Sequence, residues 1–246
     1  ITLPSQIIIA FLNSVGEISN FTVFKVLALS FLCYLIFAAI IIIFIIAARI
    51  PKEDSGMYAY MLLFANVGFL GYPVIQAIFG QVAIIYAVVA NIAFNILAYS
   101  VGVVFISNKT SSKFNLKLML NPPMISVVIS SILFLLNARL PIFLSSSLNY
   151  LSNTTTPLAM IILGATIAQI PINEMFDEWK IYVFTLLRLI VAPVAVFSVM
   201  KTLNITDPLI LGTLVILAGM PVATNATMMS IQYGGNSKLA SQGVFF

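Results

Sequence analysis

The chain has 246 residues, of which 61% are hydrophobic and 7% are charged, with a net charge of +4 and no histidine. Soluble domains carry about 25% charged residues, so this composition cannot cover a water-exposed surface and indicates an all-α polytopic membrane protein. The dispersed positive charge forms no basic stripe and argues against a nucleic-acid partner. Without histidine, imidazole metal ligands and serine–histidine nucleophiles are excluded, so we expect neither an enzyme nor a metal site.

Apolar segments long enough to cross a bilayer, about 20 residues each, follow one another along the chain. We expect a partial span at 2–12, complete spans at 21–48, 57–79, 82–106, 119–136, 150–170, 180–200 and 208–232, and the start of another at 239–246. Both ends fall inside apolar runs and no signal peptide is visible. We therefore expect a piece of a longer chain that lacks one helix at the start and most of one at the end.

The loops between the spans hold nearly all the charge, and they predict the orientation. One side collects Arg49, Lys52, Lys109, Lys113, Lys117, Lys180 and Lys238, and the other Lys25, Arg139 and Lys201. Lysine and arginine are enriched in cytoplasmic loops. The first set, including the polar loop 107–117, is therefore predicted to be cytoplasmic in a multi-pass protein of the cell membrane.

Two of the spans are interrupted at their centres by glycine, proline and asparagine. One reads LLFANVGFLGYPVIQAIFG (62–80) and the other LVILAGMPVATNATMMSIQYG (214–234). Such breaks free backbone groups that lipid cannot satisfy, so they belong where they face protein or a water-filled cavity. A matching pair of broken helices is the sequence pattern of a transporter's binding site. The alternative is a pair of ordinary kinks.

The pairing of the breaks also predicts the domain organisation. The segment ITLPSQIIIAFL resembles TTTPLAMIILGA, and each precedes one broken span. We expect a first repeat at 1–106, a central cytoplasmic loop at 107–118 and a second repeat at 119–246. Five helices in each repeat fit the spacing, and an odd number gives the two repeats opposite orientations.

The residues at the breaks are the candidate substrate site. At each break the start of a half-helix should direct unpaired N–H groups toward the cavity, which suits a carboxylate. The asparagines offer amide donors and acceptors, the glycines allow close approach, and the prolines end a helix. The predicted substrate-binding set is Asn66, Gly68, Gly71, Tyr72, Pro73, Gly219, Pro221, Asn225 and Arg188.

Three further features bear on the site. Arg188 lies within a span and could attract an anion, pair with carbonyls at a break, or extend to the headgroups. No carboxylate lies in mid-membrane, which suits an anionic substrate and leaves no visible carboxylate proton relay. Asn91 and Asn95 lie four residues apart on one helical face; we interpret them as helix packing rather than cavity lining.

The broken spans also resemble a known family. ANVGFLGYPV and AGMPVATNATMMSIQYGGNSKLAS are similar to the two signature segments of the auxin efflux carrier family, and ITLPSQIIIAFL is similar to its second helix. That family includes bacterial permeases for malate, malonate and similar carboxylates and the plant PIN auxin exporters. It is distantly related to bile acid/sodium symporters. The resemblance implies ten helices in two inverted repeats, with the fourth and ninth crossing at Pro73 and Pro221 beside the substrate.

The sequence thus predicts a secondary transporter of small organic anions, working by alternating access around crossed broken helices. Coupling to a proton or to Na⁺ is left open, as is a homodimer, and no cofactor is expected. The short central loop favours a prokaryotic permease. Two alternatives stay open: a membrane sensor that binds its ligand without transport, and a sodium-coupled symporter of the bile-acid type.

Overall fold

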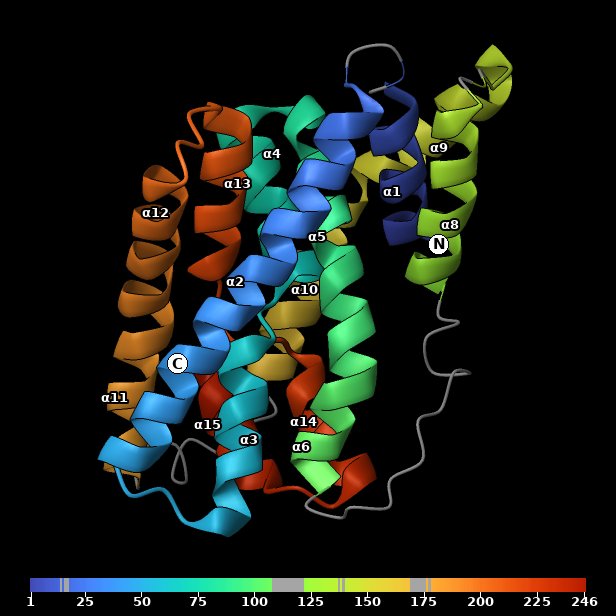
Figure 1. Ribbon diagram of the computed structural model, residues 1–246. Helices are drawn as coiled ribbons and strands as arrows, with labels where there is room; N and C mark the ends of the chain where they lie inside the picture. Colours follow the sequence, from blue (N-terminus) through green and yellow to red (C-terminus); the bar gives the residue numbers. More distant parts are fainter. Residues whose placement is uncertain are drawn as a thin grey trace.

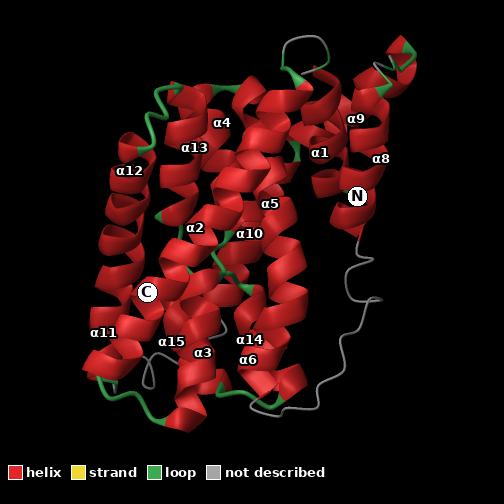
Figure 2. Cartoon of the chain, in the orientation of Figure 1, coloured by secondary structure: helices red, strands yellow, loops and turns green. Residues whose placement is uncertain are grey.

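The computed structural model describes residues 1–13, 15, 18–107, 122–136, 138, 140–168, 176 and 178–246. Within these ranges the protein is built from helices, drawn in Figures 1 and 2. In chain order they are α1 (Thr2–Asn13), α2 (Asn20–Ala47), α3 (Lys52–Leu63), η1 (Val67–Gly71), α4 (Tyr72–Phe79), η2 (Gln81–Ala83), α5 (Ile84–Leu97), η3 (Ala98–Gly102), α6 (Val103–Ser107), α8 (Pro122–Leu135), α9 (Ile142–Asn153), α10 (Thr155–Ala168), α11 (Trp179–Leu186), η5 (Leu187–Val191), α12 (Ala192–Thr202), α13 (Pro208–Ala218), α14 (Asn225–Tyr233) and α15 (Ser237–Phe245).

Three helical stretches in the described part of the chain are long and apolar enough to cross a membrane. They are Asn20–Ala47, Gln81–Ser107 and Trp179–Thr202. The first is apolar around its whole circumference and exposes large side chains such as Ile43 and Ile46, as expected for a helix that faces lipid. These stretches confirm an all-α membrane protein and match the predicted spans 21–48, 82–106 and 180–200.

The helices fall into two packed groups (Figure 1). In one, α1 packs against α8 and α9. In the other, α2 packs against α3, α5 and α12, while α13 packs against α12 and α5. The buried core lies in the second group, where α5 is enclosed along almost its whole length.

Both interrupted spans are broken in the structure, and they pass each other in the middle of the second group. The first runs from α3 through residues 64–66 into η1 and α4, and the second from α13 through residues 219–224 into α14. Figure 1 shows α3 and α14 at one end of the molecule and α4 and α13 at the other, so the two broken segments cross in opposite directions.

The start of α9 differs most from the sequence prediction. Helix is expected from residue 150, but α9 already begins at Ile142 and is separated from α10 by a single turn residue, Thr154. The serine-rich segment 142–153 is less apolar than a typical span, which is why hydropathy alone did not include it. The predicted central loop at 107–118 lies, apart from Ser107, outside the described residues, and the division into repeats at 1–106 and 119–246 stays a prediction.

Candidate substrate site at the crossing of two broken helices

Two backbone hydrogen bonds join the breaks. The N–H of Asn66 donates to the carbonyl oxygen of Pro221 at 2.9 Å, and the N–H of Ala223 donates to the carbonyl oxygen of Phe64 at 3.0 Å. They form an isolated antiparallel bridge between Ala65 and Val222. Each break therefore supplies the partners that the other lacks, which satisfies backbone groups away from water.

The position of the first break corrects one expectation. In the second broken segment the crossing involves Pro221, as predicted. In the first broken segment it lies at residues 64–66 and not at Pro73. Pro73 is buried in the first turn of α4. Proline is tolerated there because the first N–H groups of a helix have no acceptor within it. The break is thus set upstream, where Asn66 caps the helix that follows.

Asn66 and Asn225 stand at the starts of the two second halves. Asn66 is 3% exposed, and its Oδ1 accepts a hydrogen bond from the Phe69 N–H at 3.2 Å as the N-cap of η1. Its Nδ2 is buried and has no partner among the described residues. Asn225 is the first residue of α14, and its Oδ1 is also buried without a partner there. One break therefore offers a free donor and the other a free acceptor.

A cavity of about 250 Å³ lies against the crossing. It is bounded by both breaks, by one face of α5 and η3, and by the ends of α1 and α8, so it lies between the two packed groups. Its lining residues are Leu3, Ala65, Asn66, Val67, Gly68, Phe69, Asn91, Phe94, Asn95, Tyr99, Pro123, Ala223, Thr224 and Asn225. None of these described lining residues carries a charge. The cavity is therefore mostly apolar, with several amide and hydroxyl groups converging on it, as small-ligand sites usually are.

Two asparagines of α5 line this cavity, contrary to their interpretation as helix packing alone. Asn91 also packs: its Nδ2 donates to the buried Tyr72 hydroxyl at 3.0 Å. Asn95 is satisfied within its own helix, where its Nδ2 donates to the Asn91 carbonyl oxygen at 2.7 Å. Their spacing of four residues was the sequence signal. Thr224 and Tyr99 carried no comparable signal and were missed.

Arg188 lies where α3 and α13 end, and not at the helix starts that border the cavity. It projects from η5 and is 1% exposed. Its Nε donates to the Met220 carbonyl oxygen at 2.9 Å, and its Nη1 donates to the Leu62 carbonyl oxygen. The guanidinium also lies 5.4 Å from the centre of the Phe37 ring. Burial rules out extension to the headgroups. The side chain pairs with a carbonyl in the last turn of α3 and with a carbonyl of the second break, just beyond the end of α13, and is not part of the cavity lining.

This arrangement gives the crossing two different sides. The carboxyl ends of α3 and α13, which are the negative ends of their dipoles, meet the Arg188 guanidinium, a favourable pairing. The amino ends of η1 and α14 border the cavity. Positive dipole ends that are free of acidic side chains favour a bound anion.

The predicted glycines and prolines contribute to the crossing in different ways. Gly68 lines the cavity. At Gly71 a Cβ atom would lie 2.7 Å from Leu217 Cδ2, so the missing side chain allows η1 to approach α13. At Gly219 a Cβ would be 3.5 Å from the Pro193 ring, an ordinary contact. Tyr72 lies behind the cavity and supports Asn91.

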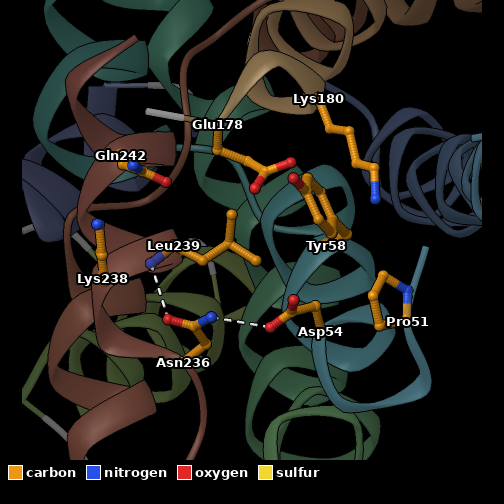
Figure 3. A pocket seen from close by; sticks show the side chains of 9 residues that line it. All are labelled: Pro51, Asp54, Tyr58, Glu178, Lys180, Asn236, Lys238, Leu239 and Gln242. Carbon is orange, nitrogen blue, oxygen red and sulfur yellow. Dashed lines mark hydrogen bonds between the residues drawn. The ribbon is translucent and has the colours of Figure 1, made fainter. Parts of the chain in front are cut away.

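A second pocket, of about 190 Å³, lies where α3, α11 and α15 begin (Figure 3). Its lining includes Asp54, Glu178, Lys180 and Lys238. Asn236 joins two of the helices, because its Nδ2 donates to Asp54 Oδ1 at 2.8 Å and its Oδ1 caps the Leu239 N–H at 3.0 Å. Acids at helix starts offset the helix dipoles. Because its charges balance and it is remote from the breaks, we interpret this pocket as a contact between helices.

Comparisons with known proteins point to one class of protein. A family model described as membrane transport protein matches residues 1–113 and 107–246. An uncharacterized transporter of Methanocaldococcus jannaschii is 29% identical over 256 aligned positions, covering the whole chain and 81% of the relative. A putative malonate transporter of Rhizobium meliloti is 22% identical over 82% of the chain and 65% of the relative. An uncharacterized transporter of Methanothermobacter thermautotrophicus is 29% identical over 80% of the chain and 66% of the relative.

Proposed function

Because the chain belongs to the membrane transport protein family, the auxin efflux carrier family that its broken spans resemble, we propose that it is a secondary transporter of small organic anions. The substrates are mono- or dicarboxylates such as malonate, malate or auxin-like acids. The family is one of transporters and not of enzymes. The proposal adds to this membership a substrate class and a site.

The observation that carries the proposal is the cavity at the crossing. It combines an apolar wall, which includes Phe69 and Phe94, with amide groups of Asn66, Asn91, Asn95 and Asn225. The starts of two half-helices border it and favour negative charge. A small carboxylate would place its oxygens toward the amides and helix starts and its carbon skeleton against the rings.

The location of the cavity supports alternating access. It lies between the group of α1 and α8 and the group that contains the crossing. Rocking of one group against the other would expose the same site first to one side of the membrane and then to the other. In this proposal the crossing stays intact, since its two backbone hydrogen bonds hold the site together. The coupling ion, a proton or Na⁺, stays open.

The substrate class agrees with one relative, which is named a putative malonate transporter. We place the protein in the cell membrane of a prokaryote, with the segment 107–117 on the cytoplasmic side and a dimer of this chain left open. A sodium-coupled symporter of bulkier bile-acid-like anions fits less well, because the cavity of about 250 Å³ suits a small acid.

The test is uptake of labelled malonate and malate into proteoliposomes that contain the full-length protein, with pH and Na⁺ gradients imposed in turn. Saturable uptake, driven by one gradient and competed by other carboxylates, is the expected result. Asn225→Ala should reduce it, whereas Asn20→Ala, at the exposed start of α2, is the matched control and should not. Ligand binding without flux in the same preparation would favour a sensor.

A further inference from the structure

The unpaired atoms of the crossing carry information about the protonation state of the ligand. The Asn66 side chain has a defined orientation, because its Oδ1 accepts from the Phe69 N–H. Its amide donor, Nδ2, has no hydrogen-bond partner among the described residues. On the other break the acceptor Asn225 Oδ1 has none either. A buried donor or acceptor without a partner costs about 1–3 kcal/mol. A well-matched ligand therefore brings one acceptor and one donor.

A carboxylate meets only half of this requirement. It can accept from Asn66 Nδ2, but it has no hydrogen to give to Asn225 Oδ1, and two acceptors facing each other repel. A protonated carboxyl group meets both, because its carbonyl oxygen accepts and its hydroxyl donates.

The charge of the cavity points in the same direction. Among the described residues that line it, none is charged, and Tyr99 is the one that can ionise. On the elements packed around the crossing, Arg188 donates to two carbonyl oxygens and Tyr72 accepts from Asn91, and neither side chain lines the cavity. Two negative charges would be buried without a counter-ion, which is costly. One negative charge can be balanced by the partial charges of the helix starts.

We propose that the crossing binds a dicarboxylate as its monoanion, with the neutral –COOH group between Asn66 Nδ2 and Asn225 Oδ1 and the –COO⁻ group elsewhere in the cavity. The proposal rests on the proposed function. A dianion takes one proton from the buffer as it binds. The ligand itself then carries the proton, and no titrating side chain of the cavity is needed for proton-linked transport.

Calorimetric titration of the purified full-length protein with malonate tests this directly. Performed in two buffers of different ionisation enthalpy, it gives the number of protons taken up per bound malonate. We expect one proton, and an affinity that falls about tenfold per pH unit where the dianion predominates. The described residues that line the cavity include no carboxylate, histidine or lysine, so this pH dependence belongs to the ligand.

Two matched ligands and one variant sharpen the test. Malonamate carries a carboxylate and an amide that both donates and accepts, so its affinity should not change over this pH range. Monomethyl malonate lacks the donor and should bind about tenfold more weakly than malonamate, the loss expected when a buried acceptor stays unpaired. Asn225→Leu removes the acceptor and should flatten the pH dependence of malonate binding.

The outcomes separate this proposal from the function on which it rests. Malonate binding with no proton uptake and no pH dependence would overturn it, because the dianion would then be held by two amide donors, and the transporter proposal would stand. If none of malonate, malate and malonamate binds at any pH in this range, both proposals fail.

Discussion

Asn66 and Pro221, which belong to different broken helices, are joined by a 2.9 Å hydrogen bond from the N–H of the first to the carbonyl oxygen of the second. The same two breaks border the cavity that we propose as the substrate site. The position of Asn66 is therefore fixed from two directions, by this bond and by its cap on the Phe69 N–H. The backbone geometry of the crossing and the chemistry of the site are thus linked at a single residue.

Asn66 should separate capping from ligand binding. Asn66→Ala removes the cap and the amide donor, and we expect a loss of about 1 kcal/mol in the free energy of unfolding together with a raised KM for uptake. Asn66→Ser retains a capping oxygen but not the amide. It should recover the stability without recovering the KM. Thermal unfolding and uptake of the two variants check this, and equal uptake by Asn66→Ser and the wild type would remove the donor from the site.

Arg188 should be needed for stability of the crossing. Arg188→Ala leaves the carbonyl groups of Leu62 and Met220 without their charged donor, and a hydrogen bond to a charged group contributes about 1.5–3 kcal/mol. We expect a loss of at least about 3 kcal/mol, measured by unfolding in detergent. Arg188→Lys keeps the charge but not the fork of N–H donors, so it should recover only part of the loss. An alanine variant as stable as the wild type would contradict the role described here.

Gly71 should be coupled to Leu217. The Cβ of a larger residue would begin 2.7 Å from Leu217 Cδ2, so Gly71→Val should cost about 1–3 kcal/mol by overpacking. Leu217→Ala opens the space, and the double variant should be more stable than the sum of the single effects predicts. Gly164→Ala is the control, since no heavy atom lies within 4 Å of a Cβ there. Strict additivity would show that the two helices do not need this close approach.

Asn91 and Asn95 should differ although they lie on the same helix face. Asn91→Ala leaves the buried Tyr72 hydroxyl without its donor, so it should lower stability by about 1 kcal/mol as well as uptake. Asn95 bonds only within its own helix among the contacts described, so Asn95→Ala should raise KM at nearly unchanged stability. Unfolding and uptake measured on both variants decide between cavity lining and packing, and an unchanged KM for Asn95→Ala would restore the packing interpretation.

The breaks were predictable because glycine, proline and asparagine at the centre of an apolar segment are a local signal. That signal identified both interrupted helices and singled out Asn66 as a site residue, although its role as a helix cap came only from the structure. The family resemblance placed the first crossing point at Pro73, seven residues beyond Asn66. Proline marks either a helix end or a helix start, and the sequence does not show which. In the structure it marks a start.

The remaining parts of the site depend on contacts between distant segments. The partners of Arg188 are backbone carbonyls of two other helices, and a carbonyl leaves no trace in the sequence. Whether Asn91 and Asn95 face a cavity or a neighbouring helix depends on how α5 is rotated, which hydropathy cannot determine for a helix that is apolar on all sides. The membrane class and the broken helices could thus be predicted, whereas the composition of the cavity required the fold.

The shared hydrogen bonds of the crossing also bear on the order of assembly. During synthesis the first break enters the membrane well before the second exists, and until then the Phe64 carbonyl and the Asn66 N–H lack the partners that they have in the folded protein. Unsatisfied backbone groups are not tolerated in lipid. Until Pro221 and Ala223 have been synthesised and inserted, the backbone groups of the first break therefore need other partners. Water, the insertion machinery or a transiently continuous helix could supply them. A chain that ends before the second break should be recognised as unfinished and degraded.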